Sequence, residues 1–151
     1  MSRIFITGAA DGLGRMAARL LAEAGHDVVL HARSKTRADE ALAAVPGAKG
    51  AIAGDLASIE QCRRIAAEVN GLGAFDAVIH NAAVGYRERR RIATVDGLSQ
   101  VFAINTLAPY ILTALIGKPK RLVYLSSGMH RGADSTLADL NWDHRAWDGS
   151  N

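Results

Sequence analysis

A short apolar strand followed at once by closely spaced glycines constrains the fold of this chain more than any other feature. Residues 4–6 are apolar, and Gly8, Gly12 and Gly14 follow before a helix-forming segment. These glycines allow a tight turn, a close approach of backbone to a pyrophosphate, and close packing of helix on strand. Because a helix N-terminus offers free N–H groups and a positive dipole end, the segment predicts a dinucleotide phosphate site, with an ordinary strand-turn-helix as the alternative.

Apolar segments alternate with amphipathic ones along most of the chain. The expected strands are residues 3–7, 26–31, 49–53, 75–80 and 121–126. The expected helices are residues 12–24, 34–44, 58–69 and 94–115, with Pro109 as a possible kink in the last. Strands that alternate with helices predict an α/β fold of Rossmann type, a doubly wound parallel sheet with about five strands. The apolar run 122–125 predicts a last strand buried on both faces.

Length and composition indicate one folded unit over residues 1–151. The apolar fraction is 49% and prolines number three, which argues against disorder. No signal peptide begins the sequence and no apolar run reaches the roughly 20 residues of a membrane span, so we expect a cytoplasmic protein with no membrane partner. The single cysteine, Cys62, lies in a helical pattern and is expected to be a buried small hydrophobe rather than a nucleophile.

Two segments outside this pattern are interpreted as loops. Positive charge is concentrated at residues 87–91, but no aromatic residues are interleaved with the arginines. A solvated loop near a phosphate-bearing cofactor is therefore favoured over a nucleic-acid surface. Residues 128–151 are polar and irregular, and Trp142 and Trp147 are expected to pack this segment against the body of the protein.

Five motifs follow one another in the order and spacing of a known family. They are residues 7–14 (Thr-Gly-Ala-Ala-Asp-Gly-Leu-Gly), Asp55-Leu56, residues 81–85 (Asn-Ala-Ala-Val-Gly), Asn105, and Ser126-Ser127. Together they resemble the short-chain dehydrogenase/reductase family over essentially the whole chain. Residues 126–130 and 139–142 further resemble the branch that contains retinol dehydrogenases. The resemblance implies an oxidoreductase that acts on a small-molecule carbonyl or alcohol.

The resemblance also implies which residues bind the dinucleotide. Asp55 corresponds to the carboxylate that binds the adenine amino group, with Leu56 beside the ring, although Asp55 alone equally fits a helix cap or turn. Asn81 corresponds to a residue that braces neighbouring strands. The cofactor-binding residues implied by the glycine motif and by the end of the fourth strand are Thr7, Gly8, Gly12, Leu13, Gly14, Asn81, Ala82 and Ala83.

The end of the second expected strand indicates which dinucleotide is bound. An acidic residue there would bind the ribose hydroxyls and repel a 2'-phosphate, but the chain reads His-Ala-Arg-Ser-Lys over residues 31–35. Arg33 stands 19 residues after Gly14, close to the spacing expected of the ribose-contacting position. Because a guanidinium holds a phosphate through paired hydrogen bonds, we expect NADP(H) in preference to NAD(H), with Ser34 and Lys35 assisting. The alternative is that Arg33 is a solvated loop charge.

Only half of the family's catalytic set can be matched. Ser127 corresponds to the serine that polarises the substrate oxygen, and Asn105 to the asparagine of the proton relay; a strand-ending turn is the alternative for Ser127. The family's Tyr-x-x-x-Lys pair, in which the ammonium lowers the pKa of the phenol, does not occur. Tyr86, Tyr110 and Tyr124 all lack a lysine four residues later.

The favoured hypothesis is therefore an NADP(H)-dependent oxidoreductase present as its cofactor-binding portion, truncated on the C-terminal side. It would transfer hydride between the cofactor and a carbonyl or secondary alcohol, but the isolated chain is expected to be inactive. The alternative is a dinucleotide-binding module without catalysis, or a decayed remnant. We expect an exposed apolar sheet edge, oligomers only for a complete chain, and neither a nucleic-acid partner nor a metal site.

Overall fold

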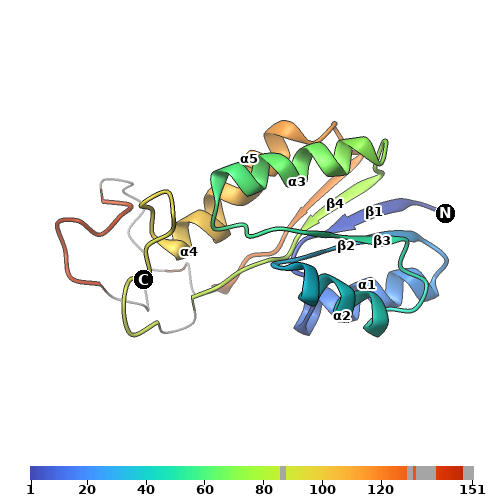
Figure 1. The fold of residues 1–151 in the computed structure, drawn as a ribbon, viewed down its shortest axis with the longest axis horizontal. Coiled ribbons are helices and arrows are strands. Elements are labelled where there is room, and N and C mark those ends of the chain that lie inside the picture. Colours follow the sequence, from blue (N-terminus) through green and yellow to red (C-terminus); the bar gives the residue numbers. More distant parts are fainter. Residues whose placement is uncertain (86–87, 129–130, 132–138, 148–151) are drawn as a thin grey trace.

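The computed structural model describes the chain except for residues 86–87, 129–130, 132–138 and 148–151 (Figure 1). Among the described residues, five strands form one parallel sheet in the order β3-β2-β1-β4-β5. The strands are β1 (Arg3–Ile6), β2 (Asp27–Ala32), β3 (Gly50–Ala53), β4 (Ala77–His80) and β5 (Arg121–Tyr124). The order reverses between β1 and β4, which opens a crevice at the carboxyl ends of these strands. The predicted α/β class is confirmed.

Helices cover both faces of the sheet and enclose two apolar clusters (Figure 1). On one face, α1 (Gly12–Glu23) and α2 (Lys35–Ala44) pack on Ile4 and Ile6 of β1. On the other, α3 (Ile59–Gly71) and α5 (Ala108–Leu115) pack on Phe5. The alternating side chains of β1 therefore serve both clusters, as expected of a central strand.

Local capping sets the helix boundaries. The side chains of Ser34 and Ser58 accept hydrogen bonds of 3.3 Å from the N–H groups of Arg37 and Gln61, so α2 and α3 begin one residue later than predicted. Gly25 follows α1 with a φ of +81°, a conformation that favours glycine.

The helix predicted over residues 94–115 begins only at Gln100 and changes pitch along its length. A short α-helical segment, α4 (Gln100–Phe102), runs into a π-helical turn, η1 (Ala103–Leu107), and then into α5. Pro109 has no N–H to give to the carbonyl of Asn105, and its ring crowds that oxygen in a regular α-helix. The wider turn before the proline accommodates this conflict, so the distortion precedes Pro109. Residues 94–98 instead form a turn in which the N–H of Thr94 donates to the carbonyl of Leu98 at 2.8 Å.

The prediction that the last strand is buried on both faces is wrong. All residues of β5 are exposed, including Leu122 and Val123 at 41% each and Tyr124 at 52%. The strand lies at the edge of the sheet beside β4, and its regular part ends at Tyr124 rather than at residue 126. The expected exposed apolar edge is thus confirmed, while full burial would require a further layer over β5.

The described contacts of the two expected loops concern the packing of Trp142, Trp147 and Arg91. Trp147 donates from its indole nitrogen to the carbonyl of Glu88 at 2.8 Å, and its ring centroid lies 4.9 Å from that of Trp142, so these side chains pack the tail segment on the 88–91 loop. Arg91 donates to the carbonyl of Gly97 at 3.0 Å. Arg87 lies outside the described residues.

Cys62 is buried, as the sequence predicts. This burial raises the pKa of its thiol to about 11, which disfavours a nucleophilic thiolate.

Two features are absent from the part of the chain that the structure describes. There, no helix combines the length and the apolar character needed to cross a membrane. The same residues contain no group of three or more His, Cys, Asp or Glu side chains arranged to hold a metal ion.

Candidate functional site

A cavity of about 370 Å³ lies at the carboxyl ends of β1 to β4. Its walls come from the β1–α1 turn, the segments that follow β2, β3 and β4, and the π-helical turn. All predicted cofactor-binding residues except Thr7 and Ser34 line this cavity. The lining residues are Gly8, Asp11, Gly12, Leu13, Gly14, His31, Arg33, Gly54, Asp55, Leu56, Asn81, Ala82, Ala83, Val84 and Ile104.

Each glycine of the β1–α1 turn meets a different steric demand. Gly8 has a φ of +66°, and a Cβ there would lie 2.8 Å from the Cα of Ala82. A Cβ on Gly14 would overlap the carbonyl oxygen of Gly8 and the amide nitrogen of Asn81. Gly12 has a φ of +49° but no atom within 4 Å of such a Cβ. The turn is therefore closed on its inner side and open at Gly12, where α1 begins.

Thr7 and Asn81 join the turn to the end of β4. The side-chain amide of Asn81 donates to the carbonyl oxygens of Thr7 and Gly8, both at 3.0 Å. The Thr7 hydroxyl accepts from the N–H groups of Asn81 at 3.0 Å and Ala82 at 3.1 Å. Thr7 is thus buried between the strands instead of facing the cavity, and Asn81 has the bracing contacts that the resemblance implies.

His31 holds the turn from the opposite side and was missed in the sequence. Its Nδ1 accepts from the N–H of Gly8 at 3.2 Å, and its Nε2 lies 2.9 Å from the carbonyl oxygen of Gly54. A ring that accepts at Nδ1 and donates at Nε2 is neutral. Burial lowers the pKa of His31, against the smaller opposing effects of the Gly54 hydrogen bond and the charge of Asp55. The one available signal was a polar residue directly after the apolar run 28–30 of the second strand.

At the other end of the cavity, Arg33 and Asp55 lie where β2 and β3 end. Arg33 is exposed at the cavity wall. Asp55 accepts from the N–H of Ala57 at 2.9 Å through one carboxylate oxygen, so it has the turn role left open by the sequence and also lines the cavity. Leu56 is buried at 6% exposure, while Ser34 caps α2.

The two predicted catalytic residues lie outside the cavity lining. Asn105 sits in the π-helical turn, where its side chain both accepts from the N–H of Val84 at 2.9 Å and donates to the Val84 carbonyl at 2.8 Å. Ser127 is exposed and follows the end of β5. Of the described tyrosines, Tyr110 is 70% exposed, and Tyr124 bonds Thr113 at 2.7 Å and stacks on His80. Tyr86 lies outside the described residues.

The residues of the cavity fit a nicotinamide dinucleotide. The open side of Gly12 leaves room for a phosphate at the start of α1, whose first N–H groups point there. Small residues, Ala82 and Ala83, line the wall after β4, and Arg33 supplies a positive charge at the end of β2. The parallel sheet, its glycine turn and a cavity at the strand order reversal define an α/β protein of Rossmann type.

A family model described as short chain dehydrogenase matches residues 2–121. The chain belongs to the short-chain dehydrogenase family, as its ordered motifs indicate.

Two curated relatives agree with this assignment. An uncharacterized oxidoreductase of Emericella nidulans is 53% identical over 146 residues, which cover 95% of this chain and 57% of the relative. Retinol dehydrogenase 13 of Mus musculus is 30% identical over 157 residues, covering 96% and 46%, which supports the resemblance to that branch. The chain thus spans about half the length of the curated relatives it matches.

Solved structures share the fold. A protein of Mycobacterium paratuberculosis has a TM-score of 0.86 at 31% identity, over 99% of this chain and 55% of the other. A short-chain dehydrogenase of Sphingobium yanoikuyae, solved in complex with NADPH, has a TM-score of 0.73 at 25% identity, over 87% of this chain and 56% of the other.

The packing of Gly14 predicts that Gly14→Ala destabilises the fold and weakens dinucleotide binding. A Cβ there overlaps backbone and amide atoms that are held by the turn, so we expect a loss of about 1–3 kcal/mol in the free energy of unfolding, measured in urea. Gly71→Ala is the matched control, because Gly71 is helical and a Cβ there meets no atom within 4 Å. Equal effects of the two changes would contradict this account of the turn.

The neutral state of His31 predicts a loss of stability in mild acid. Burial lowers the pKa of His31 below its ordinary 6.5. The contribution of the neutral ring to the free energy of unfolding is therefore complete above about pH 6.5 and is lost as the pH falls toward the folded-state pKa. His31→Leu leaves two backbone groups unpaired and should cost about 1–3 kcal/mol at pH 7. The difference from wild type in urea unfolding should shrink at pH 5.

Two features of this test separate His31 from other histidines. Burial also lowers the pKa of His80, to about 4, but His80 is present in both proteins and cancels in their difference. His144→Leu, at an exposed position, is the control for the loss of a histidine as such. A constant difference for His31→Leu would show that its protonation does not affect the turn.

Proposed function

We propose that this chain binds NADP(H) in preference to NAD(H) and forms the cofactor-binding portion of an oxidoreductase. The observation that carries the proposal is one cavity that unites the glycine turn, the start of α1 and Arg33. The complete reaction would transfer hydride between the nicotinamide and a small-molecule carbonyl or secondary alcohol. Family membership supports this reaction class, and the NADPH complex of the Sphingobium yanoikuyae relative supports the choice of cofactor.

The phosphate groups would be held mainly by backbone. The N–H groups at the start of α1 and the positive end of its dipole favour an anion beside Gly12, where no Cβ blocks the approach. Leu13 is 64% exposed at the cavity wall, which suits contact with a ligand better than contact with water. Thr7 and Asn81 act indirectly, since their hydrogen bonds fix the turn that presents these N–H groups.

The adenosine end of the cavity supports the preference for a 2'-phosphate. The guanidinium of Arg33 offers paired donors to phosphate oxygens. The Ser34 hydroxyl accepts from Arg37 and retains its own proton, which it can donate to the same phosphate. Asp55 lies on the far side of the end of β2, where its carboxylate suits the adenine amino group, beside Leu56.

The catalytic roles are divided between two short segments. The cofactor, when bound, supplies or accepts the hydride. We assign to Ser127 a hydrogen bond to the substrate oxygen, and to Asn105 a place in the proton relay. The paired bonds of the Asn105 side chain to Val84 support the loop after β4. The location in the cytoplasm remains a prediction from the sequence.

A dinucleotide-binding module without catalysis is the second candidate. It is favoured by one feature of these 151 residues, the lack of a Tyr-x-x-x-Lys pair. NADPH binding by this chain is expected of both candidates. A Tyr-x-x-x-Lys pair elsewhere in the protein would favour the oxidoreductase, because that pair supplies the proton donor.

Replacing Arg33 tests the proposed cofactor preference. Arg33→Asp should lower the affinity for NADPH by roughly 10- to 100-fold, because a charged hydrogen bond is lost and a repulsion is added. The affinity for NADH should be unchanged or higher, since a carboxylate there can bind both ribose hydroxyls. Calorimetric titration measures both constants, with exposed Arg89→Asp as the control of equal charge change. An equal loss for both dinucleotides would contradict the assigned role of Arg33.

The 151-residue chain is predicted to bind NADPH without turning over carbonyl substrates. The missing acid leaves the alkoxide formed by hydride transfer without a proton donor. The reaction rate should therefore be lower by a factor on the order of 100 or more. The measurement is NADPH oxidation with a panel of ketones and aldehydes, using a preparation whose NADPH binding has been established by calorimetry. Turnover that follows the purified chain and is abolished by Ser127→Ala would overturn this prediction.

A further inference from the structure

A carboxylate stands in the wall of the proposed anion-binding cavity. Asp11 precedes α1 and lines the same cavity as Arg33. Its backbone is extended and its side chain makes no capping hydrogen bond, although this is the position where an aspartate commonly caps a helix. With its side chain 71% exposed, an unpaired Asp11 would place a negative charge beside bound phosphates.

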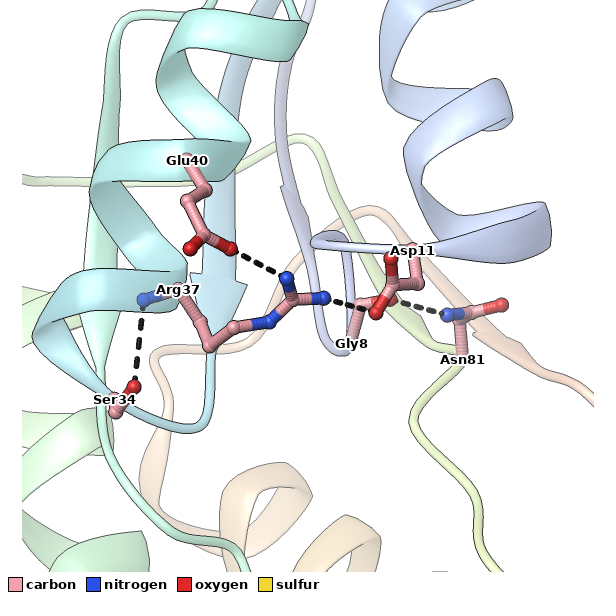
Figure 2. A network of polar contacts seen from close by, with 6 residues as sticks. All are labelled: Gly8, Asp11, Ser34, Arg37, Glu40 and Asn81. Atoms are coloured by element: carbon pink, nitrogen blue, oxygen red, sulfur yellow. Dashed lines mark hydrogen bonds and ion pairs between the residues drawn. The ribbon is translucent and has the colours of Figure 1, made fainter.

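Arg37 holds this carboxylate from the neighbouring helix. One terminal nitrogen of its guanidinium pairs with Asp11 and the other with Glu40, one helical turn away on α2. Figure 2 shows the guanidinium extending from α2 toward the β1–α1 turn, between these two acidic side chains. Both hydrogen bonds raise the pKa of Arg37. The arginine therefore joins the phosphate-binding turn to the helix that follows Arg33.

The charge of Asp11 matters more for one dinucleotide than for the other. Both carry the pyrophosphate, but the 2'-phosphate adds up to two negative charges at the Arg33 end of the cavity. Repulsion between exposed unit charges falls off over a Debye length of about 8 Å. An unneutralised Asp11 carboxylate in the same wall would repel the 2'-phosphate, so it would oppose NADPH more than NADH.

We propose that Arg37 is a specificity-determining residue that neutralises Asp11 and thereby permits binding of a 2'-phosphorylated dinucleotide at Arg33. The proposal rests on the proposed function, because it concerns the affinity of the same cavity for NADPH. Two observations favour this indirect role over direct contact with the phosphate. Both terminal nitrogens of Arg37 already bind carboxylates, and Arg37 does not line the cavity, whereas Asp11 and Arg33 do.

Rescue of one variant by a second tests the proposal. Arg37→Gln should lower the affinity for NADPH by roughly 5- to 10-fold and that for NADH by less, so the ratio of the two affinities falls. Asp11→Asn alone should raise the NADPH affinity. The double variant, in which both charges are removed, should bind NADPH as wild type does. Calorimetric titration of the 151-residue chain gives these constants, and the same titrations with adenosine 2',5'-bisphosphate and AMP isolate the 2'-phosphate effect.

A charge change on another ion pair is the control for this test. Arg19→Gln removes the same charge from an exposed pair with Glu23 on α1 and should leave the affinity ratio unchanged. Thermal unfolding should differ little among the variants, because exposed ion pairs contribute little to stability. A double variant as weak as Arg37→Gln would assign Arg37 a direct phosphate contact and overturn the proposal, as would an unchanged ratio for Arg37→Gln. Wild-type chain that prefers NADH, or binds neither dinucleotide, would contradict the proposed function itself.

Discussion

The hydrogen bonds around Gly8 determine the geometry of the whole site. Its N–H donates to His31 at the end of β2, and its carbonyl accepts from Asn81 after β4. Because this peptide unit is held on both sides, the left-handed conformation of Gly8 is fixed. This conformation sets the direction in which α1 leaves the sheet. Because Gly14 packs directly against the same carbonyl, the helix can approach only where no Cβ intervenes. The orientation of the N–H groups at the start of α1 thus depends on two side chains from neighbouring strands.

The sequence predicted the fold well where local signals and tertiary packing agree. Apolar runs marked the strands, and the helices expected over residues 12–24, 34–44 and 58–69 begin and end within two residues of those bounds. Residues 94–99 misled because their conformation depends on a distant contact. The Asp96 carboxylate accepts from the N–H of Ile59 at the start of α3, at 2.9 Å, and this contact holds the segment as a turn. Helical periodicity carries no information about such a long-range cap.

The site was predictable to the extent that its function depends on backbone shape. Glycines and small residues leave a recognisable pattern, and the motif order added Asp55 and Asn81, which do meet at one cavity. His31 and Arg37 were missed for a different reason. A histidine in a strand and an arginine in a helix are ordinary residues, and only the spatial neighbours Gly8, Gly54 and Asp11 give them a role.

The cavity proposed for the dinucleotide and the proposed catalytic residue Ser127 occupy separate parts of this chain. The cavity is built from residues up to Ile104, which come from the carboxyl ends of β1 to β4 and from the π-helical turn. Ser127 instead follows β5, the strand whose apolar side chains are exposed. A layer packed on β5 would change the surroundings of Ser127 while leaving the hydrogen bonds of Gly8, His31 and Asn81 in place. The cavity proposed for the cofactor is therefore built by this part of the fold alone, whereas the surroundings of Ser127 depend on what covers β5.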